Sequence, residues 1–156
     1  MLDCGLAARY KLVRSGIIEL QVSHLFFTHH HSDHDAYYAS FLLTRFDMYI
    51  GKDSTLKVYR PPPAESLTEK LIGENQGAYW HNFVASANHP ISLWAYRDRG
   101  GRLPRPIPEV TVKDIHPGKM ISGPDWTIEY ARVEHGQPYL DSLVCRVNTN
   151  NGTIVF

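Results

Sequence analysis

The chain has 156 residues, enough for one domain with a buried core. Its 43% hydrophobic and 21% charged residues are ordinary for a globular protein, and its 16 basic residues balance its 16 acidic ones. This balance argues against a protein that overall charge holds to nucleic acid or to an anionic membrane. No apolar run approaches the ~20 residues of a membrane span, and no signal peptide is recognisable. The well-separated Cys4 and Cys145 favour two reduced core thiols in a cytoplasmic protein.

The first third of the chain predicts a helix, a strand and a second helix. Residues 6–18 have helical apolar spacing, and the apolar run 22–28 predicts a short, central, parallel strand. Ser32 and Asp35 form an S-x-x-D capping signature, which predicts a helix that begins there and ends at Gly51.

The remainder predicts further strands around one long irregular segment. A strand is expected at 56–59 and a helix at 61–79, where prolines open the first turn. Residues 80 to 108 combine four arginines with Trp and Tyr residues, paired glycines and prolines, and predict an irregular insert. Strand-like alternation then returns, so the order favours a mixed sheet packed by helices; the strands are expected at 110–115, 126–133 and 143–147.

Both ends of the chain resemble interrupted strands. Residues 1–5 are typical of a strand that enters a turn, and 152–156 of a strand that has just begun after an Asn-Asn-Gly turn. Because a domain rarely ends inside a strand, we expect a fragment that is cut at both edges.

A cluster of metal-ligand residues directly follows the predicted strand 22–28. His29, His31, Asp33 and His34 have the spacing H-x-H-x-D-H. Imidazole and carboxylate are the ligands that Zn²⁺, Mn²⁺ and Fe²⁺ prefer where thiolates are absent. His29 and His31 lie two apart at a strand end and can converge on one ion. Asp33 and His34 follow at a helix start and are directed toward a second ion.

A third imidazole for the first ion has to come from elsewhere in the chain. His135 is the candidate, because it follows the predicted strand 126–133 at the strand-to-loop position where active sites gather. His30, between two ligand positions, is expected to point away and to pack or hydrogen-bond. His24, inside a strand pattern, is expected to be a core or edge histidine.

The motif and its surroundings resemble the metallo-β-lactamase fold superfamily, and most closely its ribonuclease Z and arylsulfatase-like branch. The resemblance rests on Asp3-Cys4-Gly5, the run 26–34, Val133-Glu134-His135-Gly136 and the closing 152–156. It implies an α+β fold, a partial αβ/βα sandwich, in one incomplete domain (1–156), with a dinuclear site that usually holds two Zn²⁺ ions. By position, the first metal would be held by His29, His31 and His135, and the second in part by Asp33 and His34.

The chain also departs from the superfamily pattern. There, the strand that matches 153–156 continues into a small-Gly-Asp segment whose aspartate bridges both metals, and a final histidine follows further downstream. This sequence therefore lacks two expected ligands as well as the first strands. Ribonuclease Z enzymes carry a tRNA-gripping arm between the third histidine and that aspartate, and too few residues follow His135 to hold one. The difference favours a small-molecule ester as the substrate.

The resemblance implies a metal-dependent hydrolase that acts on a phosphodiester, sulfate ester or related ester through a metal-bound hydroxide. Asp33 would orient the hydroxide and accept its proton. Two alternatives remain open: a tRNA 3′-processing endonuclease, and a non-catalytic metal-binding fragment. The first is motivated by basic residues that alternate with aromatic ones, namely Arg97, Arg99, Arg102 and Arg105. No membrane attachment is expected, and RNA is a less favoured partner than a small ester. The resemblance leaves a homodimer open, because related enzymes are often dimers, and the metal identity (Zn²⁺, Mn²⁺ or Fe²⁺) stays open as well.

Overall fold

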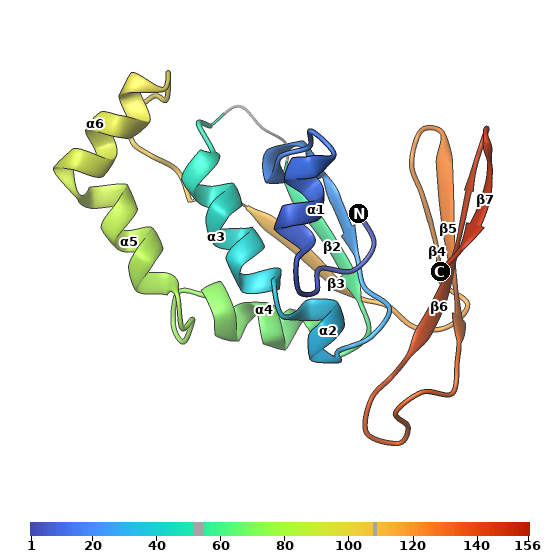
Figure 1. Ribbon diagram of the computed structural model, residues 1–156. Coiled ribbons are helices and arrows are strands. Elements are labelled where there is room, and N and C mark those ends of the chain that lie inside the picture. Colours follow the sequence, from blue (N-terminus) through green and yellow to red (C-terminus); the bar gives the residue numbers. More distant parts are fainter. Residues whose placement is uncertain (52–54, 108) are drawn as a thin grey trace.

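The computed structural model describes residues 1–51, 55–107 and 109–156, which form three layers (Figure 1). A layer of helices covers one face of a three-stranded sheet, and a four-stranded sheet covers the other face. The fold is therefore α+β, as predicted. Within these residues the outer face of the second sheet carries no helix, so the layers are those of a partial sandwich (Figure 1).

The first sheet is parallel and has the order β1-β2-β3. Its strands are β1 (His24–Phe26), β2 (Leu56–Arg60) and β3 (Val110–Asp114). The predicted parallel strand after residue 22 is confirmed, since β1 pairs with β2 in parallel. The predicted central position is wrong: β1 is the edge strand of this sheet, and its other side makes only one isolated bridge, between Leu2 and Phe26. An apolar run indicates that both faces of a strand are buried, but it does not indicate whether another strand pairs with each of its two sides.

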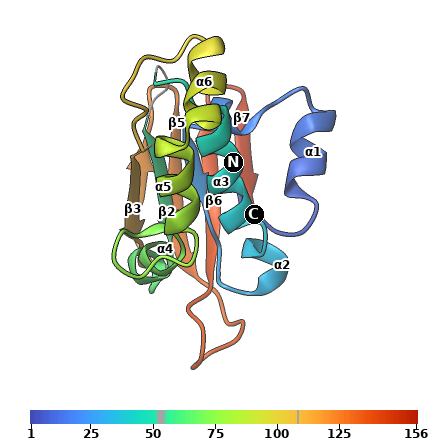
Figure 2. The same cartoon turned by 90° about the vertical axis from the view of Figure 1, so that its left-hand side faces the viewer.

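Helices α3 (Tyr38–Met48) and α4 (Ala64–Ile72) lie on one face of this sheet, whereas α1 (Ala8–Arg14) lies to one side of it (Figure 2). A short 3₁₀ helix spans Glu19–Gln21. The predicted helix from Ser32 is divided, because α2 (Ser32–Asp35) ends before α3 begins. The capping prediction is also wrong: His31 occupies the N-cap position and makes no side-chain capping bond. The core between helices and sheet includes Cys4, Leu25, Phe27, Phe41, Leu42, Leu56 and Val58.

The predicted irregular insert contains a helical hairpin. Helices α5 (Trp80–Asn88) and α6 (Pro90–Asp98) extend beyond α3 at the far side of the helical layer (Figure 1), and Pro108 lies outside the described residues. The prediction of irregular structure is wrong for 80–98, because Pro90 stands in the first turn of α6, where a helix tolerates proline. The paired glycines follow the end of α6.

The second sheet is antiparallel in the order β4-β5-β6-β7. It consists of β4 (Met120–Ser122), which was not predicted, β5 (Trp126–Arg132), β6 (Leu143–Thr149) and β7 (Gly152–Val155). The two sheets meet through aromatic rings: Phe26 stacks on Tyr59 at 5.2 Å and meets the edge of Trp126 at 5.6 Å. None of the helices in the described part of the chain is long and apolar enough to cross a membrane.

Candidate metal centre

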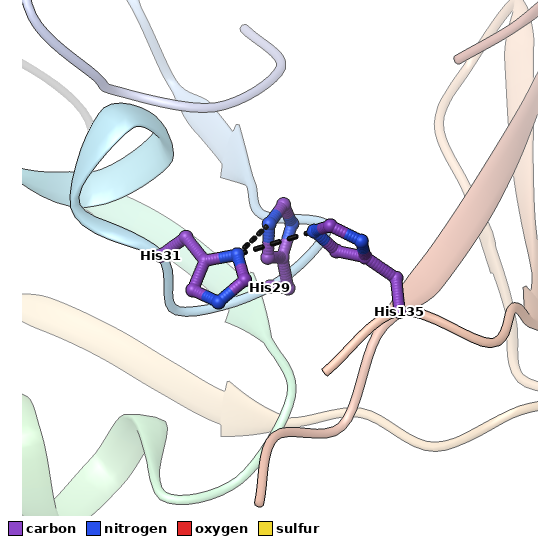
Figure 3. A group of neighbouring side chains, drawn as sticks. All are labelled: His29, His31 and His135. Carbon is purple, nitrogen blue, oxygen red and sulfur yellow. Dashed lines mark hydrogen bonds between the residues drawn. The ribbon is translucent and has the colours of Figure 1, made fainter. Parts of the chain in front are cut away.

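Three imidazole rings converge where the ends of the two sheets meet (Figure 3). His31 Nδ1 lies 3.0 Å from His29 Nε2 and 3.1 Å from His135 Nε2. All three ligand atoms lie within 4.8 Å of one another. His29 and His31 come from the loop after β1, whereas His135 comes from the loop between β5 and β6. The structure thus brings together the three histidines that the sequence assigned to one ion.

The donor set fits a divalent metal. Ring nitrogens that share a tetrahedral Zn²⁺ ion at about 2.0–2.1 Å lie roughly 3.3 Å apart, close to the 3.0 and 3.1 Å that separate His31 Nδ1 from His29 Nε2 and His135 Nε2. His29 is buried, His31 is half-buried and His135 is exposed. A site built in this way has a closed side on the protein and an open side toward solvent, which is the arrangement that catalytic sites need.

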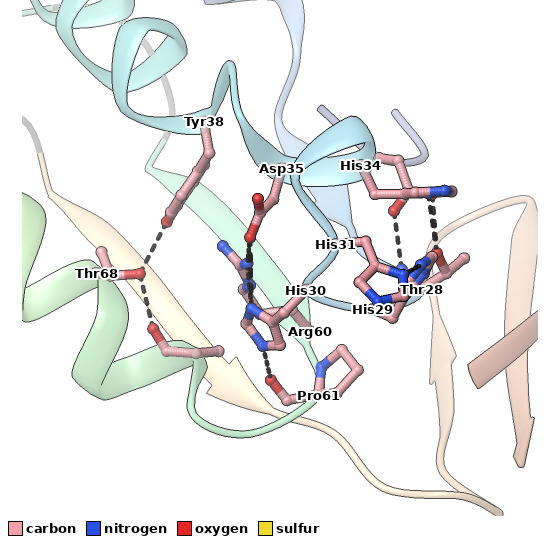
Figure 4. Close-up of polar contacts among 12 residues, drawn as sticks. Thr28, His29, His30, His31, His34, Asp35, Tyr38, Arg60, Pro61 and Thr68 are labelled. Atoms are coloured by element: carbon pink, nitrogen blue, oxygen red, sulfur yellow. Dashed lines mark hydrogen bonds and ion pairs between the residues drawn. The ribbon is translucent and has the colours of Figure 1, made fainter. Parts of the chain in front are cut away.

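The buried carboxylate of Asp3 sets the proton positions on the rings of His34 and His29. Its Oδ2 accepts hydrogen bonds from His34 Nδ1 at 2.7 Å and from Thr28 Oγ1 at 2.9 Å, and its Oδ1 accepts one from Thr28 N at 2.8 Å. Because Thr28 Oγ1 donates to Asp3, it accepts from His29 Nδ1, which lies 2.9 Å away (Figure 4). Both rings then carry their proton on Nδ1 and leave the Nε2 lone pair free for a metal.

Asp33 and His34 form a second group of ligand atoms beside the first. Asp33 Oδ2 lies 3.5 Å from His34 Nε2, the nitrogen that the contact with Asp3 leaves free. The His34 ring is tilted against the His29 ring with centroids 4.1 Å apart, so the two groups adjoin. The Asp33 side chain is 74% exposed and can reach an ion without being displaced from a packed position.

The backbone of α2 is held tightly against the N-terminal segment. Cys4 N donates to His34 O at 2.7 Å, and Tyr37 N donates to Cys4 O at 2.9 Å. A Cβ atom at Gly5 would lie 1.7 Å from the Asp33 carbonyl oxygen, so only glycine allows this approach. The position of Asp33 and His34 therefore depends on residues that precede β1.

Electrostatics keep His29 in the neutral form that binds metals. Burial, together with the neighbouring His34, His31 and His135 rings, lowers the pKa of His29 below its ordinary value of 6.5, although Asp3 acts in the opposite direction. A neutral imidazole offers its lone pair to a cation at neutral pH.

The loop that carries His135 is fixed by local hydrogen bonds. His135 N donates to Gln137 Oε1 at 2.6 Å, and the Gln137 amide donates back to Val133 O at 2.8 Å. Ser142 Oγ donates to His135 O, and Leu143 N donates to Thr28 O at 2.9 Å, which joins this loop to the motif after β1. Gly136, with φ of 89°, provides the left-handed turn that the loop requires.

Two histidines outside the ligand set behave as predicted. His30 points away from the cluster, and its Nε2 donates to Pro61 O at 2.7 Å while its Nδ1 contacts Arg60 (Figure 4). His24 is an edge-strand histidine that stacks near Phe26 and Tyr59. Asp3 and Thr28 were missed as site residues, although Asp3 belongs to the turn that carried the family resemblance. Nothing in the local spacing indicates that Asp3 contacts residues 25 and 31 positions further on.

At the level of sequence, no family model and no curated protein matches the chain. Solved structures do match. The metallo-β-lactamase fold protein YhfI from Bacillus subtilis has a TM-score of 0.63 at 16% identity, over 99% of this chain and 48% of that one. Human tRNase Z, short form, has a TM-score of 0.59 at 14% identity, over 99% and 56%. A diphosphatase of the PhnP family has a TM-score of 0.54 at 16% identity, over 94% and 44%.

These likenesses extend over nearly the whole chain, and the chain spans about half the length of the structures that it matches. At such identities they define the architecture, and they agree with the partial sandwich of two sheets described above. The chain has the metallo-β-lactamase fold.

Proposed function

We propose that this chain carries the metal centre of a metal-dependent hydrolase that acts on a small phosphodiester, sulfate ester or related ester. The observation that supports it most is the convergence of His29 Nε2, His31 Nδ1 and His135 Nε2, with Asp33 and His34 adjoining. Bound divalent ions at such a site lower the pKa of water and stabilise the charge of entering and leaving oxygens. Zn²⁺ is the expected ion, with Mn²⁺ and Fe²⁺ as alternatives.

The side chains have distinct tasks in this proposal. His29, His31 and His135 hold the first ion, while Asp33 and His34 help to hold the second. The exposed Asp33 carboxylate, whose Oδ2 lies 3.5 Å from His34 Nε2, would also be placed to orient a water at this centre and to take its proton. Asp3 keeps the His34 proton on Nδ1.

A cavity lies beside Asp33 and His34, and its lining does not include His29, His31 or His135. It has a volume of about 370 Å³ and is also lined by Asp3, Lys11 and Phe156. Ligand pockets for small molecules begin at about 300 Å³.

The test measures both the bound metal and the rate of ester hydrolysis. The tag-free chain is analysed for bound metal and assayed with bis(p-nitrophenyl) phosphate and p-nitrophenyl sulfate. We expect His31→Ala and Asp33→Ala each to abolish turnover while the circular dichroism spectrum stays unchanged. His116→Ala and Asp125→Asn change exposed residues outside the cluster and serve as matched controls. Wild-type rates in either site variant contradict the proposal, and bound metal without turnover supports a non-catalytic metal-binding chain.

RNA processing is a second candidate, and two observations favour it. Human tRNase Z is among the structures that this chain resembles. In addition, α6 exposes Trp94 (68%) and Arg97, with Arg102 exposed just beyond it. This segment nevertheless offers fewer free cationic groups to RNA than its composition suggests, because two of its arginines donate to main-chain carbonyls: Arg99 to Asp47 and Arg105 to Phe46. RNA affinity that falls with salt and is lost in Arg97→Gln/Arg102→Gln would favour this candidate.

A further inference from the structure

Arg60 places a positive charge in the core directly behind the metal motif. It ends β2, and its side chain is 0% exposed. Its Nη2 donates to Asp35 Oδ2 at 2.7 Å and to His30 Nδ1 at 2.5 Å. The guanidinium carbon lies 4.2 Å from the ring centroid of Phe27 and 5.0 Å from that of Tyr38. Its Nε and Nη1 have no hydrogen-bond partner among the described residues.

Stability alone is a poor explanation for this arrangement. Removing a guanidinium from water is costly, and apolar residues of similar volume often replace a buried ion pair without loss of stability. Burial lowers the pKa of Arg60, despite the opposing effect of Asp35. Nη2 makes a charge-assisted hydrogen bond to Asp35, whereas three of the five guanidinium N–H donors, those on Nε and Nη1, have no partner among the described residues.

The two partners of Arg60 belong to the two halves of the metal motif. His30 stands between His29 and His31, and Asp35 directly follows His34 in α2. Because His30 Nδ1 accepts from Arg60, its proton lies on Nε2 and is donated to Pro61 O at 2.7 Å. The His30 ring is thus held at its two nitrogens by Arg60, which ends β2, and by Pro61, which follows it. The same guanidinium also holds α2 through Asp35.

We propose that Arg60 is a positioning residue of the metal centre, which fixes the loop of His29 and His31 and the helix of Asp33 and His34 in one mutual arrangement. The proposal rests on the proposed function, since it concerns the same centre. It differs from a merely stabilising role in one respect: losing Arg60 should change metal binding even where the free energy of unfolding is restored.

The experiment compares Arg60→Met with Arg60→Met/Asp35→Leu. The single variant leaves a largely buried carboxylate without its partner and is expected to be less stable. The double variant replaces the ion pair with apolar side chains and should unfold near the wild-type temperature. Each full-length apo protein is titrated with Co²⁺, and the visible absorption spectrum reports both affinity and coordination geometry.

We expect the double variant to bind the more weakly held Co²⁺ ion about 10- to 100-fold less tightly, with an altered spectrum, because residues that orient ligands have effects of this size. Arg60→Lys keeps the charge and should regain part of the affinity. Arg105→Met is the matched control, since Arg105 is also buried, also lies over aromatic rings (4.3 Å from Phe46) and is outside the metal motif. It should lower stability without changing the Co²⁺ spectrum.

Wild-type affinity and spectrum in the folded double variant would overturn the positioning role and leave the proposed function intact. A wild-type chain that binds no Co²⁺ would overturn both. A change of the same size in Arg105→Met would also overturn the positioning role, because any buried arginine would then have the same effect.

Discussion

Asp3→Asn tests the claim that one carboxylate sets the protons of two ligand rings. Asn has the same shape as Asp but replaces one acceptor oxygen with an NH₂ donor. Its oxygen can still accept from Thr28 N, but its amide then faces Thr28 Oγ1 and His34 Nδ1, which both donate to Asp3 in the wild type. To accept from the new amide, His34 has to move its proton to Nε2, the nitrogen assigned to the second ion.

The size of the effect follows from these contacts. Loss of a residue that orients a ligand weakens metal binding by about 10- to 100-fold, or roughly 1.4–2.8 kcal/mol. We expect the affinity for the second ion to fall by this full amount, since His34 contacts Asp3 directly. The first ion should lose less than about 10-fold, because Thr28 separates His29 from the altered group and its hydroxyl can rotate. Stability should fall by about 1.5–3 kcal/mol, the value of a hydrogen bond to a charged group.

The assay is competition between the protein and a chromophoric chelator for Zn²⁺, with the two dissociation constants fitted separately. Asp125→Asn makes the same chemical change at an exposed position and should leave both constants unchanged. If Asp3→Asn weakens the binding of the first ion more than that of the second, or weakens the binding of neither ion, the proton assignment derived from the Asp3 contacts is wrong.

Three further outcomes are expected. Gly5→Ala should lower the free energy of unfolding in urea by at least roughly 1–3 kcal/mol, because the new Cβ overlaps the carbonyl oxygen of Asp33; an unchanged midpoint would refute the close approach. Burial raises the pKa of Cys4 to about 12 and that of Cys145 to about 11, so both thiols should resist a disulfide reagent at pH 8 until the protein unfolds. Since the unfolded chain ionises its thiols first, stability should be unaffected by them below about pH 9 and should fall above it, as alkaline urea titration would show. Tyr130→Phe removes a buried hydroxyl that has no partner among the described residues, so the melting temperature should stay the same or rise, and a large drop would reveal a missed contact.

The ligand cluster was accessible from the sequence because most of it is local. His29, His31, Asp33 and His34 lie within six consecutive residues, and the alternation of a strand end fixes which side chains share a side. His135 required only the general rule that functional side chains gather where strands end and loops begin. Their proximity is observed, and their role as metal ligands stays a prediction.

Residues that support the cluster were not accessible in this way. Arg60 reads locally as the end of a strand before three prolines, and Asp35 reads as a capping residue. Their contact at 2.7 Å exists only because β2 lies next to β1 in the sheet. Partners that are brought together by strand pairing leave no periodic trace in a single sequence.

The helices α5 and α6 were missed for a related reason. Each has nine residues, too few to be stable alone, so their own sequences carry weak helical signals. Packing supplies the stability: Phe83 meets the edge of Phe46 at 4.6 Å, and Arg105 lies over both Phe46 and Tyr96.

The loop between β5 and β6 gives the histidine cluster a mechanical consequence. His31 and His135 are 104 residues apart in the chain and belong to the ends of different sheets, so an ion shared by them is a crosslink between the two sheets. Crosslinks that close long loops remove the most entropy from the unfolded chain. An ion present at 100 times its dissociation constant would add about 2.7 kcal/mol to the free energy of unfolding. Removal of the ion by a chelator would therefore weaken the contact between the two sheets first. Amide hydrogens of β5 and β6 would then exchange faster, while exchange in the helical layer would not yet change.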